Sequence, residues 1–119
     1  MEENILNKIK TKLEELNIPV CYGIAKKKDV QDAEEFIVFG RVGININQQI
    51  TARTRRFEVV IVSKDWVSDE LIADVVAKAK EAGLKVSNNT DAEISYQTKN
   101  DTAYELVSIQ FIKLERVDF

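Results

Sequence analysis

Paired carboxylates are the side chains in this sequence that could most readily do chemistry. They stand at Glu14-Glu15, Glu34-Glu35 and Asp69-Glu70, and two carboxyl groups that face one cleft can divide general acid and base roles. Residues adjacent in sequence do not face each other on a helix, however, and all three pairs fall at expected element ends or on solvated faces. We therefore expect no catalytic residues and no enzymatic activity.

Histidine is absent and Cys21 is the single cysteine, which limits the other kinds of site. Zinc sites draw mainly on Cys and His, and Ser–His or Cys–His nucleophilic pairs need an imidazole. The four glycines form no phosphate-binding cluster before a helix. Gly40 and Gly43 instead favour a bend or bulge where a strand leaves its sheet. We expect no metal and no cofactor, and we expect Cys21 to behave as a small buried hydrophobe.

The net charge of −3 is unevenly distributed along the chain. Residues 26–56 contain seven basic and four acidic side chains, so this segment carries +3 and the remainder carries −6. Regions of opposite sign allow one copy to meet another head to side, which suits a ring or filament. Ordinary scatter of surface charge is the alternative, because an asymmetry of this size is common.

The stretch RVGININQQITARTRR, Arg41–Arg56, separates two apolar runs that are typical of strands. Those runs are EEFIVFG, Glu34–Gly40, and FEVVIVS, Phe57–Ser63. Hairpin loops usually contain about two to five residues, so a longer polar connection needs a reason. We interpret it as a long arm around residues 43–53 that becomes ordered against another molecule.

The remaining patterns predict one α+β domain over residues 1–119, with element order α-β-β-β-α-β-β. Apolar residues at three- and four-residue steps predict a helix over 3–17. A second helix should begin after the N-cap Ser68 and end before Gly83. Strands over 18–24, 92–99 and 102–117 complete the set, with Asn100-Asp101 as the turn of a C-terminal hairpin. We expect two helices packed on one face of a mostly antiparallel sheet, with Phe57–Ser63 as its central strand.

Two further expectations concern single features of the chain. Trp66, just before the second helix, is interpreted as a partly buried staple onto the core. The N-terminus has no apolar core of signal-peptide type, and no stretch approaches the ~20 apolar residues of a membrane span. We therefore expect a protein made in the cytoplasm that does not enter a membrane.

The order of these features resembles the tail-terminator, or tail-completion, and related neck proteins of long-tailed bacteriophages and prophages. An N-terminal amphipathic helix leads into the Pro-headed strand IPVCYG, and EFIVFG and RRFEVVIVS bracket a polar arm. One helix follows, and the chain closes with a hairpin whose last strand is YELVSIQFIKLER. The resemblance extends over nearly the full chain.

The resemblance implies a virion structural protein, assembled in the host cytoplasm, that forms a hexameric ring without catalysis. Such a ring caps the tail-tube protein and meets the head connector proteins, and DNA passes through it without sequence-specific binding. The arm would then reach a neighbouring subunit, where its polar residues contact acidic surface. The candidate interface residues are Arg41, Asn45, Asn47, Gln48, Gln49, Arg53, Arg55 and Arg56.

Two alternative functions stay open at this point. One is another neck part, such as a head-closure or connector protein, which has similar size and charge. The other is a small cytoplasmic nucleic-acid-binding or regulatory module, in which Arg53, Arg55 and Arg56 contact phosphates together with the lysines at 26–28. No aromatic residue stands among these cations for base stacking.

Overall fold

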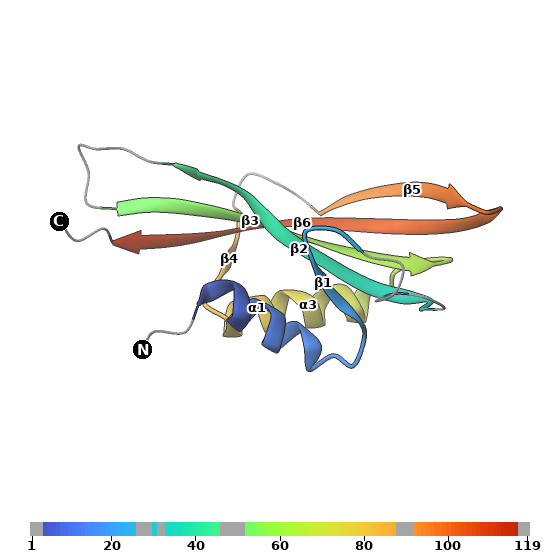
Figure 1. The fold of residues 1–119 in the computed structure, drawn as a ribbon, viewed down its shortest axis with the longest axis horizontal. Helices are drawn as coiled ribbons and strands as arrows, with labels where there is room; N and C mark the ends of the chain where they lie inside the picture. Colours follow the sequence, from blue (N-terminus) through green and yellow to red (C-terminus); the bar gives the residue numbers. More distant parts are fainter. Residues whose placement is uncertain (1–3, 26–29, 31–32, 46–51, 88–91, 117–119) are drawn as a thin grey trace.

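A computed structural model describes residues 4–25, 30, 33–45, 52–87 and 92–116. Within these ranges the fold is α+β, with two helices and a six-stranded, mostly antiparallel sheet (Figure 1). The elements in chain order are α1 (Ile5–Glu14), β1 (Val20–Tyr22), β2 (Glu35–Asn45), β3 (Ala52–Lys64), α3 (Asp69–Glu81), β4 (Lys85–Val86), β5 (Glu93–Lys99) and β6 (Thr102–Arg116).

The sheet is organised around β3 and β6, its two longest strands. Its order is β1-β2-β3-β6-β4, and β5 also pairs with β6. The β3–β6 ladder runs from Ala52 opposite Arg116 to Lys64 opposite Tyr104, whereas β1 lies parallel to β2 over three residues. The expectation that Phe57–Ser63 belongs to a central strand is confirmed, because β3 is hydrogen-bonded on both sides.

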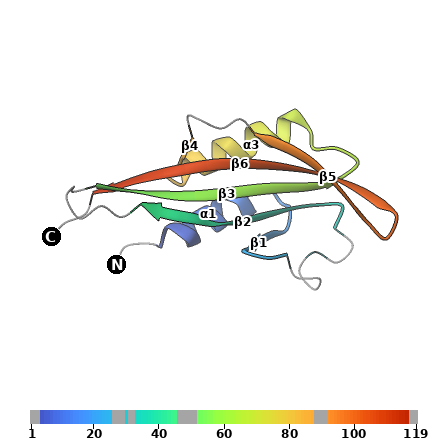
Figure 2. The same cartoon turned by 90° about the horizontal axis from the view of Figure 1, so that it is seen from above.

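The main core lies on the side of the sheet that faces the helices. Directly opposite residues of an antiparallel pair share a face, and this face carries Phe39, Phe57 and Phe111, all nearly inaccessible to solvent. Ile9 and Leu13 of α1 and Val75 and Ala79 of α3 belong to the same buried cluster. α1 and α3 lie next to each other, as Figures 1 and 2 show.

Local chemistry explains where the helices begin and end. The side chain of Asn4 accepts a hydrogen bond from the amide of Leu6 at 2.8 Å, so α1 begins two residues later than expected. The hydroxyl of Ser68 accepts from the amide of Leu71 at 3.1 Å, which confirms the predicted N-cap of α3. Gly83 follows α3 with φ of 98°, a left-handed conformation that glycine adopts without steric cost.

The segment expected to form a long arm is partly strand. Gly43, Ile44 and Asn45 pair with Arg56, Arg55 and Thr54, so β2 and β3 continue past the positions where their apolar runs end. The register shifts between Arg41 and Gly43, which is the bulge that the glycine pair predicts. The strands extend because backbone pairing tolerates polar side chains, and the connection between them is correspondingly shorter than 43–53. Residues 46–51 lie outside the described part.

The opposite face of the sheet also carries apolar side chains. Phe36 is opposite Val62, which is opposite Leu106, and Val38 is opposite Val60 two rungs further along the same face. Val62 is buried, and the other four are half-buried. One more strand was not expected: β4, only two residues long, pairs with Ile112 and Phe111 of β6.

Candidate functional site

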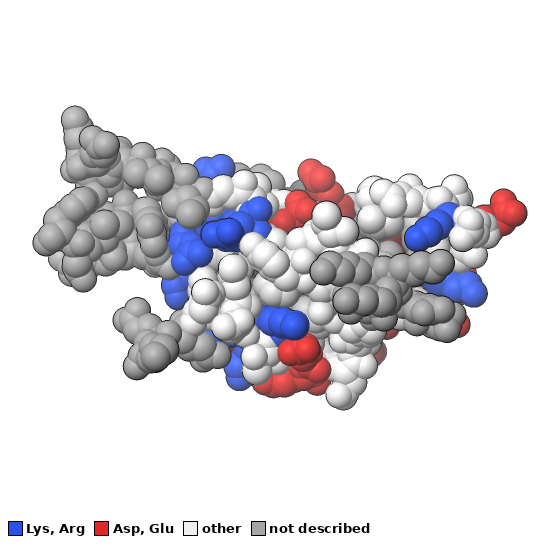
Figure 3. Space-filling view, viewed as in Figure 1, with Lys and Arg blue, Asp and Glu red and all other residues white. Residues whose placement is uncertain are grey.

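The expected interface arginines converge at one end of the β2–β3–β6 ladder. Arg41 is opposite Phe57, Arg56 is opposite Gly43, and Arg55 lies between Ile44 and Lys113. We call Arg41, Arg55, Arg56 and Lys113 the basic end. Lysine and arginine side chains gather visibly toward this end of the molecule in Figure 3.

Two of these arginines are held by aromatic side chains. The Nε of Arg41 donates to the hydroxyl of Tyr22 at 3.2 Å, and the Tyr22 ring packs against Phe39 with centroids 5.3 Å apart. The Arg55 guanidinium carbon lies 5.5 Å from the centroid of the buried Phe57 ring, a cation–π distance. These contacts orient two of the cations beside the end of the core, while Arg56 is exposed on the opposite face.

The other expected interface residues are only partly placed. The backbones of Asn45 and Arg53 lie in β2 and β3, opposite Thr54 and Glu115, but their side chains are outside the described part. Asn47, Gln48 and Gln49 are outside it altogether. The sequence did not point to Tyr22 and Lys113, because a side-chain hydrogen bond brings Tyr22 to Arg41 and the strand register brings Lys113 to Arg55.

A network of ion pairs links the two helices. Lys78 Nζ of α3 lies 2.8 Å from Glu15 Oε1 just after α1, and Lys12 Nζ lies 3.5 Å from Glu81 Oε1. The hydrogen bond from Lys78 lowers the pKa of the Glu15 carboxyl, and the same bond raises the pKa of Lys78. Figure 3 shows acidic side chains in the lower part of the molecule, where the helices lie, next to basic ones.

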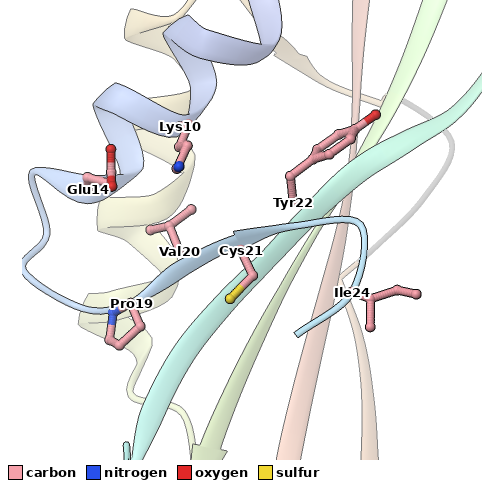
Figure 4. Close-up of a pocket in the computed structure, with 7 residues that line it drawn as sticks. All are labelled: Lys10, Glu14, Pro19, Val20, Cys21, Tyr22 and Ile24. Carbon is pink, nitrogen blue, oxygen red and sulfur yellow. The ribbon is translucent and has the colours of Figure 1, made fainter. Parts of the chain in front are cut away.

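A shallow hollow of about 380 Å³ lies between α1 and β1 (Figure 4). Its lining combines one cation and one carboxylate, Lys10 and Glu14, with Pro19, Val20, Cys21, Tyr22 and Ile24. Cys21 is buried, as expected. In Figure 4 Tyr22 points away from the other side chains. Its wall includes Tyr22, the tyrosine whose hydroxyl accepts a hydrogen bond from Arg41.

Several large apolar side chains are exposed on the strands and their connections. Trp66 is 71% exposed, so its interpretation as a buried staple is wrong. Its neighbour Val67 is buried instead and donates its amide to Glu105 Oε1 at 2.8 Å. Tyr96 and Ile94 of β5 are 72% and 55% exposed.

Glu105 also contacts β5 through Tyr96. It lies directly opposite Tyr96 in the β5–β6 ladder, and its hydrogen bond with the hydroxyl is the main cause that raises the pKa of Tyr96. One carboxylate therefore ties both the exposed β5 strand and the segment before α3 to β6.

Among the described residues no group of three or more acidic, Cys or His side chains is placed to hold a metal ion. No described helix is long and apolar enough to cross a membrane. The sequence matches no protein-family model, and no curated protein matches it.

Proposed function

We propose that this chain is a structural subunit of a long-tailed phage or prophage particle. In this role it forms a ring, hexameric as the resemblance implies, that terminates the tail tube and joins it to the head. The observation that carries the proposal is the basic end: four cations from β2, β3 and β6 within three rungs of one ladder, two of them oriented by aromatic rings.

The distribution of charge favours contact between different surfaces of neighbouring copies. The basic end of one copy is complementary to exposed acidic side chains on the helices of the next, such as Glu14, Glu70 and Asp74. A contact between two different patches repeats head to tail, and it closes into a ring when the rotation permits. The proposal takes both helices to pack on one face of the sheet, which leaves the half-buried apolar residues of the other face for contact with tube or connector.

Light scattering after size-exclusion chromatography, with negative-stain images of any large species, tests the ring. The full chain should give a closed ring, and Arg56→Glu should shift the population to smaller species by reversing one exposed charge at the interface. Lys64→Glu is the matched control, because Lys64 is an exposed cation on the same strand away from the basic end. A ring that is unchanged by Arg56→Glu would contradict the role of the basic end.

The basic end also favours one second candidate, direct binding to DNA. Arg41, Arg56 and Lys113 could each neutralise a phosphate, in which case affinity should fall steeply with salt. A gel shift with duplex DNA at low salt distinguishes the candidates, since the ring proposal requires no stable complex with free DNA. Binding to tail-tube protein, rather than to a portal protein, separates a terminator from a head-closure part.

A further inference from the structure

Among the described residues, no strand pairs with the outer edge of β5. All seven residues of Glu93–Lys99 are exposed, and β6 is the only described strand that pairs with β5. β4 pairs with the same side of β6, but further along, at Ile112 and Phe111. Figure 1 shows β5 at the border of the sheet, projecting toward the hairpin tip. An open edge presents a row of backbone donors and acceptors that another strand can pair with.

The turn of the hairpin determines which backbone groups face outward. Asn100 and Asp101 both have positive φ, 52° and 64°, as in a type I′ turn of two residues. The flanking residues Lys99 and Thr102 then exchange both backbone hydrogen bonds, and such pairs alternate along an antiparallel ladder. Glu93, Ser95, Gln97 and Lys99 consequently bond to β6, whereas Ile94, Tyr96 and Thr98 direct their N–H and C=O to the open edge.

The sequence of β5 is complementary to itself when reversed. In EISYQTK, an antiparallel copy centred on Tyr96 places Glu93 opposite Lys99 at both ends. Ile94 then lies opposite Thr98, and Ser95 lies opposite Gln97. Opposite charges directly across an antiparallel pair stabilise it, and like charges destabilise it.

The register required by charge agrees with the register required by the backbone. Tyr96, the centre of the charge pattern, is one of the residues that direct both backbone groups outward. A two-fold axis beside Tyr96 therefore allows about six interstrand hydrogen bonds, two at Tyr96 and two at each pairing of Ile94 with Thr98. Glu93 and Lys99 fall in non-hydrogen-bonded pairs, where side chains approach most closely.

We propose that β5 is a pairing edge for a second copy of this chain, joined antiparallel about a two-fold axis at Tyr96. The two sheets become one continuous sheet across the axis. Ile94, Tyr96 and Thr98 share a face, so the exposed Tyr96 rings of the two copies lie side by side. Each ring is also positioned by Glu105 within its own copy.

This pairing is distinct from the ring contact of the proposed function. The same patch meets itself across the two-fold axis, so the association stops at two copies, whereas a ring repeats a contact between different patches. Where both contacts form, β5 joins two rings into a stacked pair. The basic end takes no part in the β5 pairing.

Two single charge reversals and their mixture test the inference by sedimentation velocity. Glu93→Lys places lysine opposite Lys99 at both ends of the pair, and Lys99→Glu places glutamate opposite Glu93, so each variant alone should dimerise at least tenfold more weakly than the wild-type chain. Mixed in equal amounts, the two variants should dimerise with each other, because each pair again holds opposite charges. The double variant Glu93→Lys with Lys99→Glu should also recover the dimer.

The mixture separates this inference from simple damage to the fold and from the ring proposal. Single variants that dimerise like the wild type, or a mixture that stays monomeric, would overturn the β5 pairing. Repeating the series in the Arg56→Glu background removes the ring contact while leaving β5 intact. Rings that form but never stack in pairs, in the wild-type chain and in every β5 variant alike, would keep the proposed function and refute this inference. A β5 dimer formed by a wild-type chain that makes no ring would keep this inference and refute the proposed function.

A backbone variant provides an independent test. Thr98→Pro removes an outward N–H but no hydrogen bond to β6, a position at which an edge strand accepts proline. It should abolish the dimer while circular dichroism and the melting temperature stay near those of the control Thr98→Ala, which should still dimerise. Dimerisation of Thr98→Pro at wild-type strength would refute the pairing.

Discussion

At the scale of single residues, aromatic rings and carboxylates determine how the charged side chains are oriented. Tyr22 and Phe57 position two arginines of the basic end, and Glu105 accepts a hydrogen bond from the Val67 amide and lies opposite Tyr96. Trp66, which the sequence suggested was a partly buried staple onto the core, is exposed, and Val67 fills the core position beside it. Which of two adjacent apolar residues turns inward depends on the backbone direction before α3, and composition does not encode that.

The pair Glu15–Lys78 should make folding stability depend on pH at both extremes. Because the folded-state pKa of Glu15 is lowered, its contribution is present above the unfolded pKa of about 4.3 and is lost as the pH falls through the folded value. The folded-state pKa of Lys78 is raised. Its contribution to folding stability is therefore present below the unfolded pKa of about 10.4 and is lost as the pH rises through the folded value.

Urea denaturation at a series of pH values measures this effect, with Glu15→Gln as the test variant. The variant should be less stable than the wild-type chain near neutral pH, and the difference should shrink below the unfolded pKa of Glu15. Glu14→Gln is the matched control, because Glu14 is the adjacent exposed carboxylate. A difference that persists unchanged in acid would contradict the pairing.

At the scale of elements, signals carried by local chemistry could be predicted and pairing between distant segments could not. Ser68, Gly83, the Asn100-Asp101 turn and the Gly40/Gly43 bulge all act on backbone within a few residues of themselves, so the sequence sufficed for them. β4 was missed because a strand of two residues is too short to show the alternation of apolar and polar side chains. Lys85–Val86 becomes a strand only because β6 lies beside it. The ends of β2 and β3 were missed because their arginines and amides resemble a loop.

The N-cap of α3 should contribute measurably to stability. Ser68→Ala removes the acceptor for the Leu71 amide and should cost about 1 kcal/mol of unfolding free energy. Ser68→Asp keeps an acceptor and should remain near wild type. Thermal and urea denaturation measure both variants, and an unaffected Ser68→Ala would mean that packing alone fixes the start of α3.

A substitution in the hairpin turn should stabilise the fold, in contrast to the loss of the N-cap. Asp101 has φ of 64°, a region that costs most L-residues roughly 1–2 kcal/mol and aspartate less. Asp101→Gly creates Asn-Gly, the preferred pair for this turn, and should raise the melting temperature. Asp101→Ala should lower it, and an equal melting temperature for both variants would exclude strain at this position.

At the scale of the whole molecule, the two proposed contacts should respond differently to salt. The ring contact rests on exposed charges, and the screening length falls from about 10 Å at 0.1 M to about 3 Å at 1 M salt. The β5 pairing also rests on backbone hydrogen bonds, so it should persist at higher salt concentrations than the ring contact does. Sedimentation velocity across this range should show rings dissociating before β5 dimers do, and simultaneous loss of both would argue against two separate contacts.

The β3–β6 ladder has a consequence for how the chain folds during synthesis. β3 ends at Lys64 and its partner begins at Thr102, so the apolar central strand emerges from the ribosome well before the strand that completes it. Until then one edge of β3 stays unpaired, the state in which strands of nascent or truncated chains associate wrongly. Because these contacts join residues far apart in sequence, folding should be slow for a chain of this size. A chain interrupted before β6 should depend on chaperones to stay soluble.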